Sequence, residues 1–193
     1  MSAFLRGHSA KESIALRVIS GSLRGLKLES LPGTDTRPTL DRVKEALFSM
    51  LFDKVANSAG LDLFAGSGAL GIELMSRYGR ECTFVDNSAE AVKVINANLT
   101  KARLTDKVSL EKCDALSFLG STPKKFEIIF LDPPYMSELY DKALGIIKQR
   151  GLLNPGGVAV CECHSGYTPS LTGYTVIKDK TYGKVRLLVL EEA

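Results

Sequence analysis

The sequence predicts an α/β domain built on a mainly parallel sheet, and three patterns along its 193 residues support this prediction. From Gly60 onward, apolar strand-like runs alternate with helical stretches, which is typical of βαβ units. After the fifth run, residues 174–190 leave no room for a crossover helix and favour an antiparallel hairpin. A glycine-rich turn follows the first run, as in sheets that bind a ligand at the carboxyl ends of their strands. We therefore expect seven strands, five parallel and two in a C-terminal hairpin.

The chain before Gly60 is expected to add a short β-hairpin and a helix. Residues 17–28 predict two short strands around a turn, and a linker rich in proline and glycine continues to Pro38. Apolar residues then recur at helical spacing from Leu40 to about Asp53, with Thr39 as the expected N-cap.

These patterns divide the chain into three parts. Residues 1–16 are expected to form a disordered extension, residues 17–38 a hairpin and linker, and residues 39–193 the main domain. The main domain should contain strands at 61–64, 81–86, 108–114, 126–132 and 157–163, with helices near 69–78, 88–102, 114–119 and 136–149. Its C-terminal hairpin is expected to turn near Tyr182 and Gly183.

Composition and charge narrow the class of protein. No run approaches the ~20 consecutive apolar residues of a membrane span, and the chain opens without an apolar signal segment. Reduced, buried thiols in a cytoplasmic protein without a metal site are expected, because all four cysteines lie inside apolar runs: Cys82, Cys113, Cys161 and Cys163. Residues 1–45 hold eight basic and five acidic residues, an excess equal to the net charge of +3 for the whole chain. This segment predicts a phosphate-facing surface, and a solvated charged face is the alternative.

The most specific local signal is LDLFAGSGALGIE, residues 61–73, in which Gly66, Gly68 and Gly71 follow a strand and open a helix. Glycines here let the backbone turn tightly and approach a ligand closely. Asp86 ends the next strand, about 20 residues later, where an acid can bind ribose hydroxyls. These features alone are compatible with a nicotinamide dinucleotide or with S-adenosylmethionine.

Asp62 favours the second ligand. A dinucleotide brings an anionic pyrophosphate to the helix N-terminus, where a neighbouring carboxylate is unfavourable. S-adenosylmethionine instead carries a sulfonium and an ammonium group, which a carboxylate attracts. Asp114, which ends the third strand, is by itself an expected helix N-cap.

A second motif, DPPY, follows the apolar run at residues 126–131. Its two prolines remove backbone donors and fix φ, so the turn is rigid and rich in acceptors. The Asp132 carboxylate and the Pro133 carbonyl can each accept one hydrogen of an exocyclic amine, and Tyr135 can stack on a base. Methyl transfer requires little beyond this alignment, because the sulfonium already activates the methyl group.

Together with RVISGSLRGLKL, RPTLDRVKEALFSML and the terminal YGKVRLLVL, these motifs resemble the RsmD family of bacterial ribosomal RNA methyltransferases. The resemblance runs from about Arg17 to Leu190. It implies a Rossmann-like class I S-adenosylmethionine-dependent methyltransferase that modifies the N2 amine of one guanine in small-subunit (16S) rRNA. It also implies that an assembled or partly assembled 30S particle can be the substrate.

The resemblance assigns roles to individual residues. It implies cofactor binding by Asp62, Phe64, Ala65, Gly66, Ser67, Gly68, Asp86, Asn87, Asp114 and Ala115, and catalysis by Asp132, Pro133, Pro134 and Tyr135. Asp114 would accept from the adenine amine and can also cap its helix. We further expect RNA phosphates to be held by Arg17, Arg24, Arg37 and Arg42 while an unpaired guanine is flipped into the DPPY pocket. A monomer is expected, since no segment looks like a spare apolar interface.

Several alternatives remain open on the sequence. The same chemistry can act on DNA adenine N6, another RNA base or a protein glutamine, although glutamine methylation usually goes with Asn at the position of Asp132. DNA adenine enzymes usually carry an additional target-recognition region, for which this chain has no room. A non-catalytic RNA-binding module is disfavoured by four intact acids, Asp62, Asp86, Asp114 and Asp132. A nicotinamide oxidoreductase is disfavoured by Asp62 and by DPPY.

Overall fold

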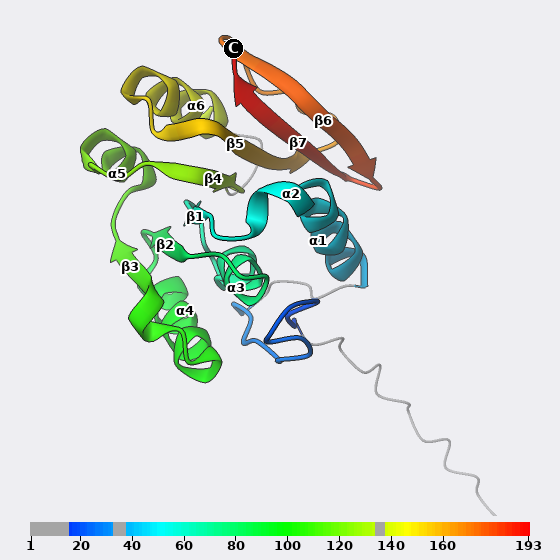
Figure 1. The fold of residues 1–193 in the computed structure, drawn as a ribbon, viewed down its shortest axis with the longest axis vertical. Helices are drawn as coiled ribbons and strands as arrows, with labels where there is room; N and C mark the ends of the chain where they lie inside the picture. The colour runs from blue at the N-terminus through cyan, green and yellow to red at the C-terminus, as the bar shows by residue number, and fades with distance from the viewer. Residues whose placement is uncertain (1–15, 33–37, 134–137) are drawn as a thin grey trace, which may run out of the picture.

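The centre of the protein is a seven-stranded sheet with the strand order β3-β2-β1-β4-β5-β7-β6 (Figure 1). The computed structural model describes residues 16–32, 38–133 and 138–193. The five parallel strands are β1 (Ala59–Asp62), β2 (Glu81–Asp86), β3 (Val108–Lys112), β4 (Phe126–Leu131) and β5 (Leu153–His164). Strand β7 (Val185–Glu192) pairs antiparallel with both β5 and β6 (Tyr174–Tyr182). The predicted seven-stranded, mainly parallel sheet with a C-terminal hairpin is confirmed.

Helices cover both faces of this sheet (Figure 1). One hydrophobic core joins the sheet to α1 (Pro38–Met50), α2 (Phe52–Val55), α3 (Ala69–Ser76) and α4 (Ala89–Ala102). A second core joins the other face to α5 (Ala115–Ser121) and α6 (Leu139–Arg150), and a short 3₁₀ turn (Thr105–Lys107) precedes β3. The strand order reverses between β1 and β4, which is where open α/β sheets form a ligand crevice at the carboxyl ends of the strands.

In the N-terminal part, the expected hairpin is present without regular strands, and the expected N-cap was wrong. Residues 17–28 fold back on themselves through an antiparallel bridge between Arg17 and Lys27, and the Val18 N–H donates to the Leu26 carbonyl at 2.9 Å. Helix α1 begins at Pro38, so Thr39 lies inside the helix and is not its N-cap. Proline suits this first turn because its missing N–H would have no helical acceptor there and its φ is already helical.

Other boundaries differ by a few residues. Strand β1 lies two residues earlier than expected, because the chain leaves the sheet after Asp62 to enter the glycine turn. Strand β5 begins at Leu153, earlier than expected. Its pairing with β4 shifts in register between Phe126 and Ile128, and this irregularity accommodates the Pro-Gly-Gly segment of β5. The hairpin turn after Tyr182 lies where it was expected.

Residues 16–32, the N-terminal arm, pack on α3 and α4 (Figure 1). The buried carboxylate of Glu73 accepts hydrogen bonds from the backbone N–H groups of Ile19 and Ser20, at 2.8 and 3.0 Å. Val18 and Leu28 are buried in the same core as α1 and α3. The arm is therefore anchored both by apolar packing and by a buried acid of the main domain.

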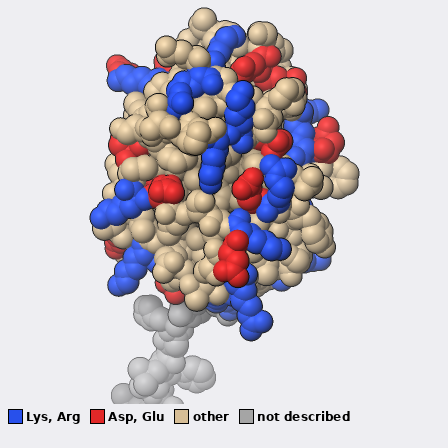
Figure 2. Space-filling model, turned by 60° about the vertical axis from the view of Figure 1, so that its left-hand side comes forward, with Lys and Arg blue, Asp and Glu red and all other residues tan. Residues whose placement is uncertain are grey.

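The cysteines and the surface complete the description. All four cysteines are free thiols, and all except Cys113 are buried. Among the described residues, no helix is long and apolar enough to cross a membrane. On the side that carries α4, β3 and α5, Lys and Arg side chains are interspersed with Asp and Glu (Figure 2). This face therefore shows charges of both signs rather than one continuous basic patch.

Candidate active site

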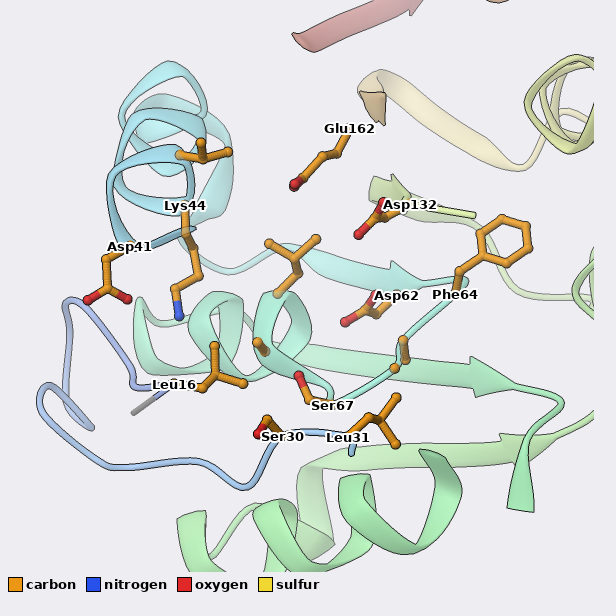
Figure 3. A pocket seen from close by; sticks show the side chains of 15 residues that line it. Leu16, Ser30, Leu31, Asp41, Lys44, Asp62, Phe64, Ser67, Asp132 and Glu162 are labelled. Atoms are coloured by element: carbon orange, nitrogen blue, oxygen red, sulfur yellow. The ribbon is translucent and has the colours of Figure 1, made fainter. Parts of the chain in front are cut away.

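Three acidic side chains from neighbouring parallel strands line one cavity of about 250 Å³ (Figure 3). Asp62 ends β1, Asp132 directly follows β4, and Glu162 lies near the end of β5. We call these three residues the acidic row. Burial raises the pKa of Asp62 to about 7, that of Asp132 to about 7 and that of Glu162 to about 8. The Asp132 side chain itself is exposed, and the protein walls of the recess around it raise its pKa.

The pairing of β1, β4 and β5 in the sheet brings the three acids of the row together. Asp62 pairs with Phe130 across β1 and β4, and Leu131 pairs with Cys161 across β4 and β5. Because side chains alternate along a strand, Asp132 and Glu162 share the face of Asp62. This is the face that α1 and α3 cover.

The glycine turn forms the opposite wall. Gly66 and Gly68 both have positive φ, and the Gly66 N–H donates to the Asp86 carboxylate at 2.9 Å. The Gly71 N–H donates to the Asp62 carboxylate, also at 2.9 Å. A Cβ on Gly71 would lie 2.3 Å from the Phe84 ring, so this glycine lets α3 approach β2 closely. Asp86 and Asp62 thus hold the two ends of the turn.

The structure brings together about half of the predicted site residues. Six of them line the cavity: Asp62, Phe64, Ala65, Gly66, Ser67 and Asp132. The Asp86 carboxylate accepts a hydrogen bond from the glycine turn, and Asn87 is exposed directly after β2. Asp114 caps α5 by accepting from the Ser117 N–H at 2.8 Å, while Ala115 is buried in the second core and Gly68 precedes α3. Pro134 and Tyr135 lie outside the described residues.

Sequence reasoning missed the rest of the lining. Leu16, Ser30 and Leu31 of the N-terminal arm line the cavity, as does Lys44 of α1 (Figure 3). Nothing in the local sequence indicates that the arm would return to this site. Glu162 could have been noticed, because it is the one acid inside the apolar run of β5.

A buried asparagine connects the arm to the glycine turn. The Asn98 amide donates to the backbone carbonyls of Glu29 and Ser67, at 3.0 and 2.9 Å, and its oxygen accepts from the Glu29 N–H at 2.7 Å. The position of the arm is therefore coupled through α4 to the turn that lines the cavity.

The predicted RNA-binding arginines differ in their surroundings. The Arg17 guanidinium pairs with the Asp41 carboxylate at 3.0 Å. Arg24 is exposed on the arm, and Arg42 is exposed on α1. Arg37 lies outside the described residues.

A second cavity, of about 350 Å³, adjoins the first. Its walls come from the ends of β4 and β5, from α6 and from the turn between β6 and β7: Asp132, Pro133, Tyr140, Glu162, Cys163, His164, Tyr167, Lys184 and Val185. Among the described residues, Asp132 and Glu162 are the two that line both cavities.

Comparison with known proteins places this site in a family. Residues 16–191 match the family model described as "Conserved hypothetical protein 95". "Ribosomal RNA small subunit methyltransferase D" of Haemophilus influenzae is 36% identical over 88% of this chain and 90% of its own length. The chain belongs to the RsmD family.

Other RsmD-like proteins support this assignment. "Putative rRNA methyltransferase YlbH" of Bacillus subtilis is 41% identical over 76% of this chain and 82% of its own length. The solved structure named "Putative methyltransferase yhhF from Escherichia coli" is 30% identical, covers 92% of this chain and 98% of that chain, and has a TM-score of 0.82. The fold is the Rossmann-like fold of class I methyltransferases, and family and fold together imply the use of S-adenosylmethionine in general.

Proposed function

We propose that this protein transfers a methyl group from S-adenosylmethionine to the exocyclic N2 amine of a guanine in small-subunit rRNA. The observation that carries the proposal is the position of Asp132, which lines both the glycine-turn cavity and the second cavity, with Pro133 beside it in the second. Two relatives are named as methyltransferases of rRNA, which favours rRNA as the substrate. The resemblance noted from the sequence supports guanine N2 as the target atom.

The first cavity fits a cationic cofactor. Asp62 uses one carboxylate oxygen to accept from Gly71, and Asp132 and Glu162 add acidic groups to the same walls. The one basic residue among the described lining, Lys44, is occupied, since it donates to the Arg17 carbonyl and pairs with Glu73 at 3.4 Å. Such walls favour the sulfonium and ammonium groups of S-adenosylmethionine over a pyrophosphate. We assign the cofactor role to the predicted residues among the lining and also to Gly68, Asp86, Asn87, Asp114 and Ala115.

Catalysis by the chain consists mainly of alignment. S-adenosylmethionine, when bound, supplies an electrophilic methyl group. The Asp132 carboxylate and the Pro133 carbonyl accept the two amine hydrogens, which points the nitrogen lone pair at the methyl carbon. As the N–C bond forms and the S–C bond breaks, the nitrogen must lose a proton. A raised pKa of about 7 lets Asp132 receive that proton near neutral pH. We also assign Pro134 and Tyr135 to this turn, with Tyr135 stacking on the base.

The RNA would reach this pocket from the side of the N-terminal arm. We propose that the exposed Arg24 and Arg42, together with Arg17 and Arg37, contact phosphates, and that the substrate guanine is unpaired and flipped. A 30S particle as the physiological substrate, a monomeric enzyme and a location in the cytoplasm, where ribosomes assemble, belong to the same proposal.

The test is transfer of labelled methyl from S-adenosylmethionine to small-subunit rRNA and to 30S particles that lack the modification, followed by digestion to nucleosides. We expect label in N2-methylguanosine and a loss of about 10³-fold in Asp132→Ala, with binding of S-adenosylhomocysteine retained. Asp53→Ala, on α2 and away from the cavities, is the matched control and should keep full activity. Label in another nucleoside, or no label although the cofactor binds, would overturn the proposed substrate.

A further inference from the structure

Glu162 has no role in the alignment described above, although it lies beside Asp132. Both carboxyl groups line the first and the second cavity, and they come from neighbouring strands of the sheet (Figure 3). Within the described part of the chain, neither carboxyl group forms a hydrogen bond or an ion pair. Asp132 is exposed at the cavity wall and Glu162 is half-buried. An acid that is partly removed from water and has no donor lowers stability, so the place of Glu162 in a cavity points to a ligand that supplies the partner.

We propose that the second cavity holds the target base and that Glu162 selects guanine by accepting a hydrogen bond from its N1–H. This inference rests on the proposed function, and it assigns the residue that decides which amino-bearing base is methylated. Glu162 is thus a specificity residue, while Asp132 and Pro133 hold the amine itself.

The bases differ in the hydrogen-bonding group next to the exocyclic amine. Adenine, cytosine and guanine all carry an exocyclic amine, so Asp132 and Pro133 by themselves would accept any of the three. In guanine the ring position next to the amine is a second donor, N1–H, whereas in adenine and cytosine it is an acceptor nitrogen. Two acceptors side by side therefore match guanine, and Glu162 would face a lone pair in the other two bases.

The protonation state of Glu162 sets how strong this preference is. Burial and the nearby Asp132 and Asp62 raise the pKa of Glu162 to about 8. A neutral carboxyl group keeps one acceptor oxygen for N1–H, and its hydroxyl can donate to the adjacent guanine O6. An ionised carboxylate accepts from N1–H alone. The neutral hydroxyl can also donate to N1 of adenine or N3 of cytosine, so the ionised carboxylate carries the discrimination.

The remaining walls of the second cavity suit a nucleoside. The Tyr140 and Tyr167 rings line it, with centroids 5.3 Å apart. Tyr140 is buried, and the partly exposed Tyr167 ring can offer aromatic surface to a planar base. Lys184 and His164 also line the cavity and are exposed, so a cationic lysine lies where a nucleotide phosphate could be held.

The experiment compares two synthetic RNAs of the methylated region, one with the target guanine and one with 2-aminopurine in its place. The analogue keeps the amine at position 2 but lacks N1–H. We expect the wild-type enzyme to prefer the guanine RNA over the 2-aminopurine RNA by about 100-fold in kcat/KM. Glu162→Leu should reduce this preference to within a few-fold. Glu162→Gln should keep only part of it, because its amide oxygen can accept from N1–H but its amide N–H can also donate to N1 of 2-aminopurine. Glu111→Leu, on the opposite edge strand β3, is the matched control and should keep the full preference.

Each outcome separates the inference from the proposed function. If the unmodified enzyme methylates both RNAs equally well, the N1–H contact is absent, and this result needs no variant. If Glu162→Leu binds S-adenosylhomocysteine normally and still prefers guanine by about 100-fold, Glu162 is not the selecting residue. In both cases guanine methylation itself stands. Failure of the unmodified enzyme to methylate guanine in any rRNA or 30S particle would instead overturn the proposed function, and this inference with it.

Discussion

On the face of the sheet that α1 and α3 cover, the carboxylate of Glu73 and the carboxylates of the acidic row differ in their partners. Glu73 accepts from the N–H groups of Ile19 and Ser20 and pairs with Arg77 at 2.8 Å and Lys44 at 3.4 Å. The three acids of the row receive one described hydrogen bond, from Gly71 to Asp62. Glu73 and Asp62 are buried, Glu162 is half-buried and Asp132 is exposed, and only the row opens into a cavity.

Glu73 therefore stabilises the fold, whereas the acids of the row lack the donors that a bound ligand could provide. A buried carboxylate stabilises a structure only when donors replace the water it has lost. Glu73 has such donors and thereby fixes the N-terminal arm to α3. The acidic row lacks them, so its burial is a cost that a cationic cofactor and the N–H groups of a base can offset.

The largest effect on stability is expected when Glu73 is replaced. Glu73→Leu should lower the free energy of unfolding by about 3–5 kcal/mol, because it leaves the buried Lys44 without its counter-charge and two partly buried backbone N–H groups without their acceptor. Urea denaturation measures this change. Glu162→Gln, in the acidic row, should leave stability unchanged or increase it. Equal losses in the two variants would contradict the comparison.

A smaller effect concerns the fit of the arm against α3. Gly21 has φ +86°, and a Cβ there would lie 1.9 Å from the Ser76 carbonyl oxygen. Gly21→Ala should therefore destabilise the protein by on the order of 3 kcal/mol, from backbone strain plus a clash. Gly25 has nearly the same φ but no atom within 4 Å of its Cβ position, so Gly25→Ala should cost about 1 kcal/mol. Thermal unfolding of both variants tests whether the contact with Ser76 matters.

The pH dependence of stability sharpens the comparison for the acidic row. Its members have a folded-state pKa of about 7 to 8, above the ordinary values of 3.8 for Asp and 4.5 for Glu. The folded protein therefore binds more protons than the unfolded chain between about pH 4 and pH 8, and stability falls as the pH rises through this window. Denaturation at several pH values should show this fall, and Glu162→Gln should reduce it. A slope that Glu162→Gln leaves unchanged would mean that Glu162 titrates normally.

The smallest effect is expected on RNA binding, when an arginine of the N-terminal arm is replaced. Arg24→Ala should weaken binding of small-subunit rRNA several-fold and reduce the salt slope of binding by about one, because one phosphate contact is lost. Arg17→Ala should have less effect, since Asp41 already neutralises that guanidinium. Lys125→Ala, at the amino end of β4, is the control that should not change binding. Filter-binding titrations at several salt concentrations measure all three.

The sequence alone determined the sheet, its hairpin and the two motifs of the candidate site. These are local patterns: apolar runs of strand length, a glycine turn that opens a helix, and an Asp-Pro-Pro turn that ends a strand. The cap role of Asp114 could be predicted for the same reason, because it depends on a residue three positions away. Thr39 was assigned wrongly because Pro38 satisfies the first helical turn equally well.

Only the tertiary structure decided which distant residues share the site. Glu162 joins Asp62 and Asp132 because β5 pairs with β4, and no local pattern states that pairing. The arm lines the cofactor cavity because Glu73 and Asn98, far along the chain, receive its backbone hydrogen bonds. A sequence shows which side chains are costly to bury, but the partner that offsets the cost is chosen by packing across the whole domain.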